Sequence, residues 1–397
     1  MNGKVFVTGT GIISAIGKNT AETLDSLVNL RGGIGKINHL DTIHKNEFVA
    51  GEVNCSLKEL QILAETSKNY NRTTLLGLIA AKEALLNSGI KNINEYRTGF
   101  ISSTTVGGMC HSELLYKEFF ENKTNENFIS QHFCGVSTDD IANELRITEF
   151  VTTISTACSS AANAIMLGAR MIKSKKLDRV IVGGTDALCK FTLNGFNTLM
   201  ILDKEWCKPF DQNRKGLNLG EGAAYLVLES EEVVKNENKK VIACLSGYGN
   251  ANDAFHQTAS SAEGLGAFLA IEQAFNIAKI SPSEIDYVNA HGTGTENNDQ
   301  SEGVALKKVF SDKVPAFSST KAYTGHTLAA AAGIEAVISI LALQHNYIFP
   351  NLNWKTSIPD LGMNPETELK KGRAVNHVLS NSFGFGGNCS SLIFSKN

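Results

Sequence analysis

The chain reads Val151-Thr152-Thr153-Ile154-Ser155-Thr156-Ala157-Cys158-Ser159-Ser160-Ala161-Ala162 near its middle. The β-branched residues predict a strand at 152–155, and the alanine-rich run predicts a helix at 159–174. Cys158 would then lie at the N-terminus of this helix, where the positive end of the helix dipole favours a thiolate. Small neighbouring side chains would let a substrate approach the sulfur. The segment predicts a nucleophilic cysteine, although by itself it fits a buried structural cysteine equally well.

Apolar runs of strand length alternate with apolar runs of helix length along the rest of the chain. The expected strands lie at 5–7, 98–102, 152–155, 179–183, 223–228, 241–248, 287–290 and 391–394. The expected helices lie at 21–28, 75–86, 141–145, 159–174, 266–278 and 328–343. Such alternation indicates layered helices and sheets of the α/β class.

Length and composition indicate a globular protein with a large core. The chain has 397 residues, of which 42% are hydrophobic and 19% are charged, so two or three domains or two halves with a shared core are expected. The polar stretch 235–240 predicts a division into residues 1–240, which carry Cys158, and residues 241–397. A net charge of −3 gives no indication of a nucleic-acid binder.

Neither end of the chain predicts a secretion signal or a membrane anchor. The first residues lead directly into an apolar strand, and the apolar run 328–343 contains Glu335 and is short for a membrane span. We therefore expect a cytoplasmic protein in which 328–343 is a buried helix. Eight cysteines form no Cys-x-x-Cys pair, so the seven besides Cys158 are expected to be small buried side chains.

A histidine follows another predicted strand. In Tyr287-Val288-Asn289-Ala290-His291-Gly292-Thr293-Gly294-Thr295, the glycines let the backbone pass close to a ligand and the threonines offer hydroxyl groups. The stretch is not a dinucleotide-binding motif, because it lacks the third glycine and a helix pattern after it. His291 is a candidate for chemistry, or else a histidine whose hydrogen bonds are satisfied within a loop.

Two further polar segments lie nearer the C-terminus. Lys321 and His326 stand among small residues between a short strand and the apolar helix, and a lysine there needs a partner such as Glu335, unless it extends from a surface loop. The run Ser380-Asn381-Ser382-Phe383-Gly384-Phe385-Gly386-Gly387-Asn388 predicts a loop before the last strand. It could supply a backbone N–H to an oxyanion and a movable aromatic side chain, or be an ordinary tight turn.

Together these segments resemble β-ketoacyl–acyl carrier protein synthases of the elongating type. The likeness rests on Thr-Ala-Cys-Ser-Ser, His-Gly-Thr-Gly-Thr, Ser-Thr-Lys…Gly-His and Asn-Ser-Phe-Gly-Phe-Gly-Gly in this order. It extends to Val7–Ser14 and to Cys207–Ala223, and so covers nearly the whole chain. It implies a thiolase fold, in which two similar βαβαβαββ halves form a five-layered α-β-α-β-α core. It also implies a homodimer, or a heterodimer with a related ketosynthase or chain-length-factor subunit.

The resemblance assigns roles to the candidate residues. Cys158 would accept an acyl chain from the phosphopantetheine of acyl carrier protein, with no covalently bound cofactor. His291 and His326 would face the malonyl thioester, and Lys321 would organise the charges with Glu335. Because two histidines are present, the likeness is to neither the initiating synthases nor the thiolases.

Further positions take supporting roles by the same resemblance. Backbone N–H groups of Cys158 and Phe385 would form an oxyanion hole, and Phe385 would also gate the acyl pocket. The other implied residues are Thr293 and Thr295 for pantetheine, Asp299 and Glu302 for a polar network, Val106, Phe191 and Phe196 for the acyl pocket, and Asn289, Glu335, Ser380 and Asn381 for a monovalent cation; no other metal is expected.

The expected function is decarboxylative Claisen condensation of an acyl group on Cys158 with malonyl-acyl carrier protein, which gives 3-oxoacyl-acyl carrier protein. The segment 146–150 lacks the Gly-Pro turn that is usual in the fatty-acid enzymes. The sequence around Asn194-Gly195-Phe196 resembles aryl-polyene and flexirubin-type synthases. Ordinary fatty acid elongation is the alternative pathway. A non-catalytic chain-length-factor-like subunit and a cysteine hydrolase using Cys158 and His291 are the alternative functions.

Overall fold

The computed structural model describes residues 3–122, 130 and 132–397. Its strands are β1 (Val5–Ser14), β2 (Gly35–Lys36), β3 (Val49–Ala50), β4 (Thr98–Ser103), β5 (Phe150–Ile154), β6 (Arg179–Asp186), β7 (Gly222–Ser230), β8 (Ala243–Asn252), β9 (Tyr287–Asn289), β10 (Ala316–Ser318), β11 (His377–Gly384) and β12 (Asn388–Ser395).

The helices occupy the segments between most of these strands. They are α1 (Thr20–Val28), α2 (Leu57–Leu63), α3 (Arg72–Ser88), α4 (Met109–Asn122), α6 (Cys134–Leu145), α7 (Ser160–Lys173), α8 (Lys190–Thr198), α9 (Glu231–Asn236), α10 (Leu265–Ala278), α11 (Glu296–Phe310), α12 (Lys321–Thr324) and α13 (Ala331–His345). The short 3-10 turns are η1 (Pro282–Glu284), η2 (Leu328–Ala330) and η3 (Phe385–Gly387).

The strands have the same arrangement in the two halves of the chain. The sheet order is β10-β9-β11-β12-β8-β1-β7-β6-β4-β5, and a short antiparallel contact joins β1 to β8. In each half, the three strands at the outer edge of the sheet run parallel to one another. The two strands nearer the middle of the sheet, β7 and β1 in one half and β12 and β8 in the other, are antiparallel to their neighbours. If the strands of each half are numbered along the chain, leaving out the small β2–β3 pair, both halves have the strand order 3-2-4-5-1 in the sheet. The expectation of two similar halves is confirmed.

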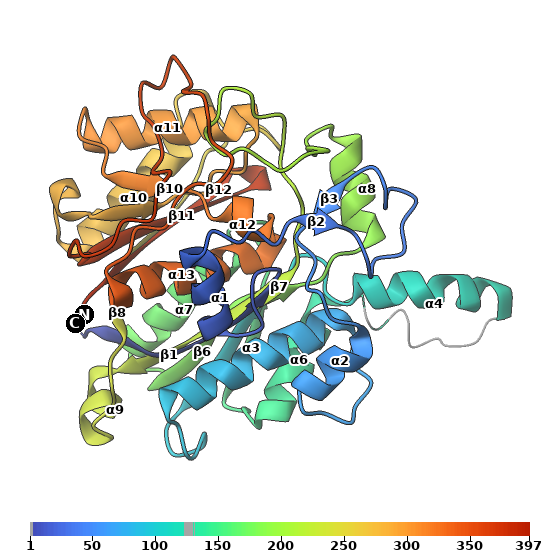
Figure 1. Cartoon of the computed structure of the whole chain (residues 1–397). Helices are drawn as coiled ribbons and strands as arrows, with labels where there is room; N and C mark the ends of the chain where they lie inside the picture. The colour runs from blue at the N-terminus through green and yellow to red at the C-terminus, as the bar shows by residue number, and fades with distance from the viewer. Residues whose placement is uncertain (1–2, 123–129, 131) are drawn as a thin grey trace.

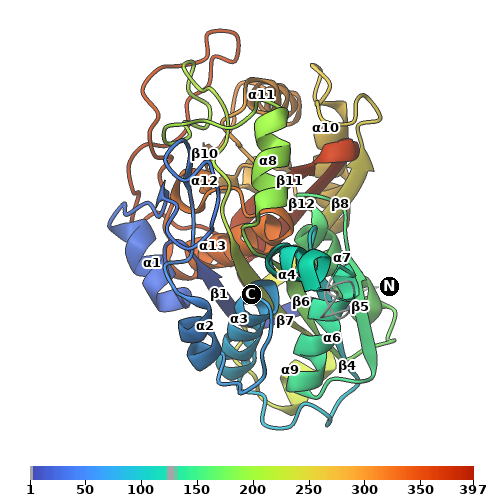
Figure 2. The ribbon, with the colours of Figure 1, turned by 90° about the vertical axis from the view of Figure 1, so that its right-hand side faces the viewer.

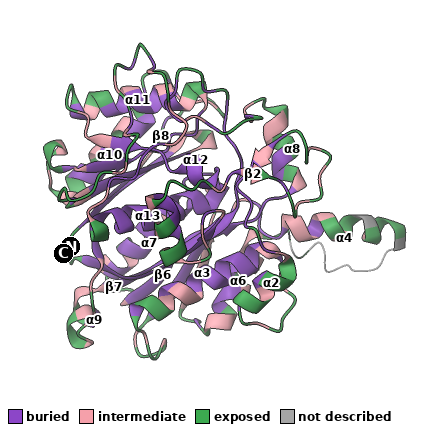
Figure 3. Ribbon diagram, viewed as in Figure 1, coloured by how far each residue is buried: buried purple, intermediate pink, exposed green. Residues whose placement is uncertain are grey.

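Helices cover both halves and also fill the space between them. Figure 1 shows α3 and α6 below one set of strands, α10 and α11 above the other, and α7 and α13 in the middle. Figure 3 shows the two middle helices as almost entirely buried. These five layers match the expected α-β-α-β-α core. The division predicted at residue 240 falls between α9 and β8 and stays a prediction.

The helix expected at 328–343 is a core element. The segment Leu328–His345 is long and apolar enough to cross a membrane, but 89% of it is buried inside the protein. Its apolar side chains pack against both sets of strands as part of the largest core cluster. Burying one valine, leucine or isoleucine side chain contributes about 1.5–3 kcal/mol to the stability of the fold, so this helix is well stabilised in the core.

Strand β1 runs from Val5 to Ser14 and is longer than the predicted strand at 5–7, because it continues through Gly9 and Gly11. A Cβ on Gly9 would lie 2.2 Å from the Ala84 carbonyl oxygen, and one on Gly11 would lie 2.0 Å from that of Ala80. These glycines let α3 pack directly on the strand. The register also shifts at Thr8, which lies opposite no partner between Val7 and Gly9.

Two other local predictions were wrong. Residues 380–384 belong to strand β11, and only Phe385–Gly387 form the turn before the last strand. A helix, α11, also follows the His291 loop, although its polar composition gave no apolar periodicity to find.

Candidate functional site

Cys158 lies in a tight turn between strand β5 and helix α7. The helix begins at Ser160 with Ser159 as its N-cap, so Cys158 lies at the N-terminus of the helix, close to where the sequence placed it. Ala157 holds a left-handed backbone conformation with φ of 51°. The Ser160 hydroxyl accepts from the Thr156 N–H at 2.8 Å and donates to the Ala157 carbonyl at 2.5 Å. These bonds stabilise the strained turn that presents the thiol.

Burial has the largest effect on the pKa of the thiol. It raises the pKa of Cys158 to about 11, because a buried thiolate loses its hydration. The positive charge of Lys321 acts against this rise, as do the backbone N–H groups of Phe385 and of Cys158 itself, which donate toward the sulfur. The two N–H groups that the resemblance assigns to an oxyanion hole both lower the pKa of the thiol, and their role in the reaction stays a prediction.

Gly384 permits this close approach. A Cβ on Gly384 would lie 2.8 Å from the Thr156 carbonyl oxygen and 3.1 Å from the Cys158 nitrogen. A larger residue would push strand β11 away from the cysteine turn. Residues 384–387 can therefore reach Cys158 only because position 384 has no side chain.

His291 follows strand β9 and is held by a buried carboxylate. Glu302 on α11 accepts from the backbone N–H of His291 at 2.9 Å and of Gly292 at 2.8 Å. It also accepts from the Asn381 amide at 3.1 Å, and burial raises its pKa to about 7. Asp299 acts similarly one turn earlier and accepts from the N–H groups of Phe210 and Gly294.

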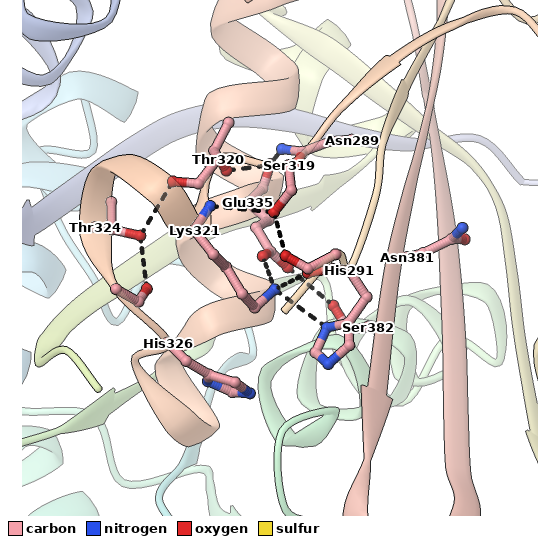
Figure 4. A network of polar contacts seen from close by, with 12 residues as sticks. Asn289, His291, Ser319, Thr320, Lys321, Thr324, His326, Glu335, Asn381 and Ser382 are labelled. Carbon is pink, nitrogen blue, oxygen red and sulfur yellow. Dashed lines mark hydrogen bonds and ion pairs between the residues drawn. The ribbon is translucent and has the colours of Figure 1, made fainter. Parts of the chain in front are cut away.

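Lys321 connects His291 to Glu335, as Figure 4 shows. Its ammonium group donates to the His291 carbonyl at 2.6 Å and lies 3.1 Å from His291 Nδ1. It also donates to the carboxylate of Glu335, which accepts a further bond from Ser382 at 3.2 Å. Lys321 and Glu335 are each 2% exposed. The predicted pair is present, and a surface-exposed lysine is excluded.

His326 lies beside His291 with its ring turned edge-on. The ring centroids are 5.5 Å apart and the planes meet at 87°. The backbone N–H of Leu328 donates to His326 Nδ1 at 3.1 Å. Burial lowers the pKa of both histidines well below 6.5, and the charge of Lys321 adds to this effect. Both rings are therefore neutral near pH 7.

The hydrogen bonds also determine which ring nitrogen carries the proton. Leu328 N–H donates to Nδ1 of His326, and the Lys321 ammonium donates to Nδ1 of His291. A neutral imidazole that accepts at Nδ1 carries its hydrogen on Nε2. The two rings therefore offer two Nε2–H donors, which is what a developing negative charge on oxygen requires.

One cavity brings seven of the predicted residues together. It has a volume of about 480 Å³, and its lining includes Cys158, Phe196, His291, Thr293, Thr295, His326 and Phe385. The Thr293 and Thr295 hydroxyls lie 2.9 Å apart. The rings of Phe196 on α8 and Phe385 stack with centroids 5.7 Å apart. A second thiol, that of Cys389, lies in the same wall.

Two predicted acyl-pocket residues lie elsewhere. Phe191 is 62% exposed at the start of α8 and is absent from the cavity lining. Val106 is buried beyond strand β4, and its N–H points toward Asp186 at 3.4 Å. The single chain does not bring either residue to Cys158.

The predicted cation residues are all buried but are engaged with the protein. The Asn289 amide donates to the Glu335 carbonyl at 3.2 Å, and Asn381 Oδ1 accepts from Ser391 at 2.9 Å. Ser380 lies in β11 beside them. Within the described part of the chain, no group of three or more His, Cys, Asp or Glu residues could hold a metal ion.

Sequence reasoning missed a polar network behind the cysteine. Asn388 Oδ1 accepts from the Ser159 hydroxyl at 2.6 Å and from the amides of Asn163 and Asn250, each at 2.9 Å. The network joins the cysteine turn to α7, β8 and the start of β12. Three asparagines far apart in the sequence carry no local signal that would reveal such a cluster.

Comparisons with known proteins agree with this arrangement. Residues 2–233 match the family model for the β-ketoacyl synthase N-terminal domain, and residues 242–355 match that for its C-terminal domain. A 3-oxoacyl-[acyl-carrier-protein] synthase 2 of Staphylococcus aureus (strain COL) is 31% identical over 409 aligned positions, which cover 100% of this chain and 99% of the relative.

Two solved structures are similar over the whole chain. The first is described as the ishigamide ketosynthase/chain length factor, with 29% identity, a TM-score of 0.95 and complete coverage of both chains. The second is the ketosynthase ApeO in complex with its chain length factor ApeC from Xenorhabdus doucetiae. It has 30% identity and a TM-score of 0.85, and the match covers 100% of this chain and 98% of that one.

Proposed function

The chain belongs to the β-ketoacyl synthase family, and we propose that it condenses an acyl group held on Cys158 with a malonyl group held on acyl carrier protein. The product is 3-oxoacyl-acyl carrier protein, and one CO2 is released per turnover. The likeness to a 3-oxoacyl-[acyl-carrier-protein] synthase over the full length of both chains supports this activity. We further propose that the protein acts in the cytoplasm.

In the first half-reaction, the Cys158 sulfur attacks the acyl thioester. The carrier's thiol leaves, and the acyl group is transferred to the sulfur. The attack creates an oxyanion, which the N–H groups of Cys158 and Phe385 are placed to stabilise. Because the pKa of the free thiol is about 11, its proton must leave as the bond forms, and the positive charge of Lys321 favours that step.

In the second half-reaction, the malonyl thioester loses CO2 and becomes an enolate. The Nε2–H groups of His291 and His326 would donate to the enolate oxygen as its charge develops. The enolate carbon then attacks the acyl carbonyl on Cys158. Collapse of the resulting tetrahedral oxyanion releases the 3-oxoacyl product and returns the thiolate, which takes up a proton.

One observation carries the proposal. Two neutral histidines, each an acceptor at Nδ1, line the same cavity as a thiol that two N–H groups approach. A cysteine hydrolase would need one histidine as a base near the thiol. It would not need the second neutral histidine, nor the buried Lys321–Glu335 pair.

Separate assays of the two half-reactions test this division of roles. Cys158→Ala should abolish acyl loading and retain malonyl decarboxylation, whereas His326→Ala should retain loading and lose decarboxylation by about 10²–10³-fold. Cys389→Ser is the matched control, since this second thiol lines the same cavity. Equal loss of both half-reactions in both variants would contradict the proposed roles.

A subunit partner forms part of the proposal. Strand β5 ends the sheet, is half-buried throughout, and pairs with β4 alone among the described strands. Helix α4 projects from the body in Figure 1 and is seen nearly end-on in Figure 2, and it exposes Leu114, Tyr116 and Phe120. An open strand edge and a projecting helix with exposed apolar side chains each favour a second subunit. The partner is a ketosynthase-like chain, either a second copy or a relative such as a chain length factor.

The alternative function is that of the non-catalytic subunit in such a pair. The likeness to structures described as a ketosynthase with a chain length factor supports this alternative, whereas the thiol and both histidines favour the catalytic role. Co-purification with a candidate partner and acyl labelling of both chains separates the two. Labelling of the partner alone would support the non-catalytic role.

The pathway is also a proposal, and it rests on a resemblance in sequence. The resemblance around Asn194-Gly195-Phe196 favours a specialised polyene pathway of the aryl-polyene or flexirubin type over fatty acid elongation. Turnover should then continue with polyenoyl carriers at rates at least equal to those with saturated carriers of the same length. A clear preference for saturated chains would favour fatty acid elongation.

A further inference from the structure

Asp186, the last residue of strand β6, is a buried carboxylate that neither half-reaction uses. It is fully buried and accepts hydrogen bonds from two separate segments. From the turn after β4 it accepts the hydroxyls of Thr104 and Thr105, at 2.5 and 2.6 Å, and the Thr105 N–H at 3.1 Å. From the turn η2 it accepts the Ala329 N–H at 2.9 Å.

The Ala329 bond is one residue away from the group that orients His326. Leu328 N–H donates to His326 Nδ1 at 3.1 Å, and Ala329 N–H donates to Asp186 Oδ2. The His326 backbone is already fixed, because its N–H donates to Asn218 and its carbonyl accepts from Gly220. What remains to be held is the turn that directs the Leu328 N–H at the ring.

That turn is strained. Leu328 has a φ of 52°, in the left-handed region that side chains larger than glycine avoid. Such a conformation persists only where its surroundings impose it. Leu328 packs in a cluster with Leu188, Leu193 and Leu217, which fixes its side chain. The carboxylate of Asp186 fixes the backbone that follows.

We propose that Asp186 is a positioning residue for the reaction, which holds η2 so that the Leu328 N–H keeps the proton of His326 on Nε2. The inference rests on the proposed function only in assigning His326 to decarboxylation. Asp186 touches no reacting atom and acts through Ala329 and Leu328. Without it, η2 relaxes, Nδ1 loses its donor, and the ring can rotate or exchange tautomers.

Four variants separate positioning from general stability. Asp186→Ala removes both acceptor oxygens. Asp186→Leu removes them but keeps a side chain branched at Cγ and leaves no cavity, so it carries the test where the alanine variant does not fold. Asp186→Asn is the conservative rescue, because its one oxygen can still accept from Ala329. Thr105→Val is the matched control, since it removes a hydroxyl bond to the same carboxylate and leaves η2 untouched.

Decarboxylation of malonyl-acyl carrier protein should fall by about a hundredfold in Asp186→Ala and Asp186→Leu, as expected for a displaced catalytic group. Acyl loading of Cys158 should fall by no more than about threefold, because His326 is not used there. Asp186→Asn should recover most of the rate, and Thr105→Val should match the unaltered protein. Equal loss of both half-reactions, or the same loss in Thr105→Val, would overturn the proposal.

A second readout does not depend on activity. In protein with 15N-labelled histidine, the side-chain nitrogen shifts report which ring nitrogen of His326 is protonated, and the signals are assigned by comparison with His326→Ala. We expect Nε2–H in the unaltered protein and a mixture of tautomers in Asp186→Leu. An unchanged His326 spectrum in Asp186→Leu would overturn the inference. An inactive unaltered protein with the expected spectra would instead count against the proposed function alone.

Discussion

Removing the ammonium group of Lys321 would leave the buried carboxylate of Glu335 without its cationic partner. In Lys321→Met, Glu335 keeps its bond from Ser382 but loses its cationic partner, and His291 loses the donors to its Nδ1 and its carbonyl. Both members of the ion pair are nearly fully buried, so water cannot replace the lost partner. One variant therefore perturbs both stability and the orientation of a proposed catalytic histidine.

The expected size follows from the burial of the pair. Breaking a buried ion pair by removing one partner costs about 3–5 kcal/mol, so the free energy of unfolding should fall by that amount near pH 7. The double variant Lys321→Met/Glu335→Gln removes both charges and should regain about 2 kcal/mol or more relative to the single variant.

The loss should also depend on pH. Burial raises the pKa of Glu335, and the charge of Lys321 opposes that rise, so the pKa rises further in Lys321→Met. An acid whose folded pKa exceeds its unfolded value contributes stability at low pH, and this contribution is lost as the pH rises through the folded pKa. The single variant should therefore lose less stability at about pH 5 than at about pH 8.

Urea unfolding at the two pH values, with decarboxylation measured in parallel, tests this reasoning. The double variant should regain stability but not activity, because His291 Nδ1 still lacks its ammonium donor. A single variant as stable as the unaltered protein would refute the stability argument. Activity that returns together with stability in the double variant would refute the role assigned to Lys321 in orienting His291.

Three further predictions concern the cysteine turn and the gate. Because the pKa of Cys158 is about 11, its alkylation by iodoacetamide should accelerate about tenfold per pH unit between about pH 7 and 9. Mass spectrometry follows the alkylation, and a rate that reaches a plateau in this range would contradict the effect of burial on the pKa. Gly384→Ala should slow acyl loading by about tenfold or more, since its Cβ would lie 2.8 Å from the Thr156 carbonyl; an unchanged loading rate would show that the turn adapts. Phe196→Ala removes a ring stacked on Phe385, an interaction worth about 1 kcal/mol, and should speed hydrolysis of the acyl-enzyme in the absence of malonyl carrier by about fivefold; unchanged hydrolysis would exclude Phe196 from the gate.

The layered α/β class was predictable from local patterns. Strands β6 and β7 contain the apolar runs 180–182 and 223–228, and α13 is apolar over most of its length. The second half of β1 was not predictable in this way. Its glycines indicate a turn unless one knows that Ala80 and Ala84 of α3 lie against them.

The site was predictable through resemblance and only partly through physics. A histidine after a strand and a lysine among small residues each had a plain structural alternative. What distinguishes them is that Lys321 meets both His291 and Glu335 in space, which no local pattern contains. Asp186 was missed for the same reason, since its donors come from other parts of the chain.

The helix-dipole argument for Cys158 placed the thiol at the right point in the fold but left out its burial. It expected a helix from residue 159, and α7 begins at Ser160. Burial then outweighs the favourable charges around the sulfur. A sequence pattern cannot show how deeply a thiol is buried.

Intact-mass analysis of acyl species on Cys158 tests the central claim most directly. The unaltered protein, Cys158→Ala and Cys389→Ser would each be incubated with a panel of acyl carriers of different length and saturation, alone and with the candidate partner subunit. We predict a mass increase equal to the acyl group in the unaltered protein and in Cys389→Ser, none in Cys158→Ala, and its disappearance as 3-oxoacyl product when malonyl carrier is added. A Cys158 that stays unmodified with every carrier and partner, or an adduct that persists in Cys158→Ala, would contradict the account.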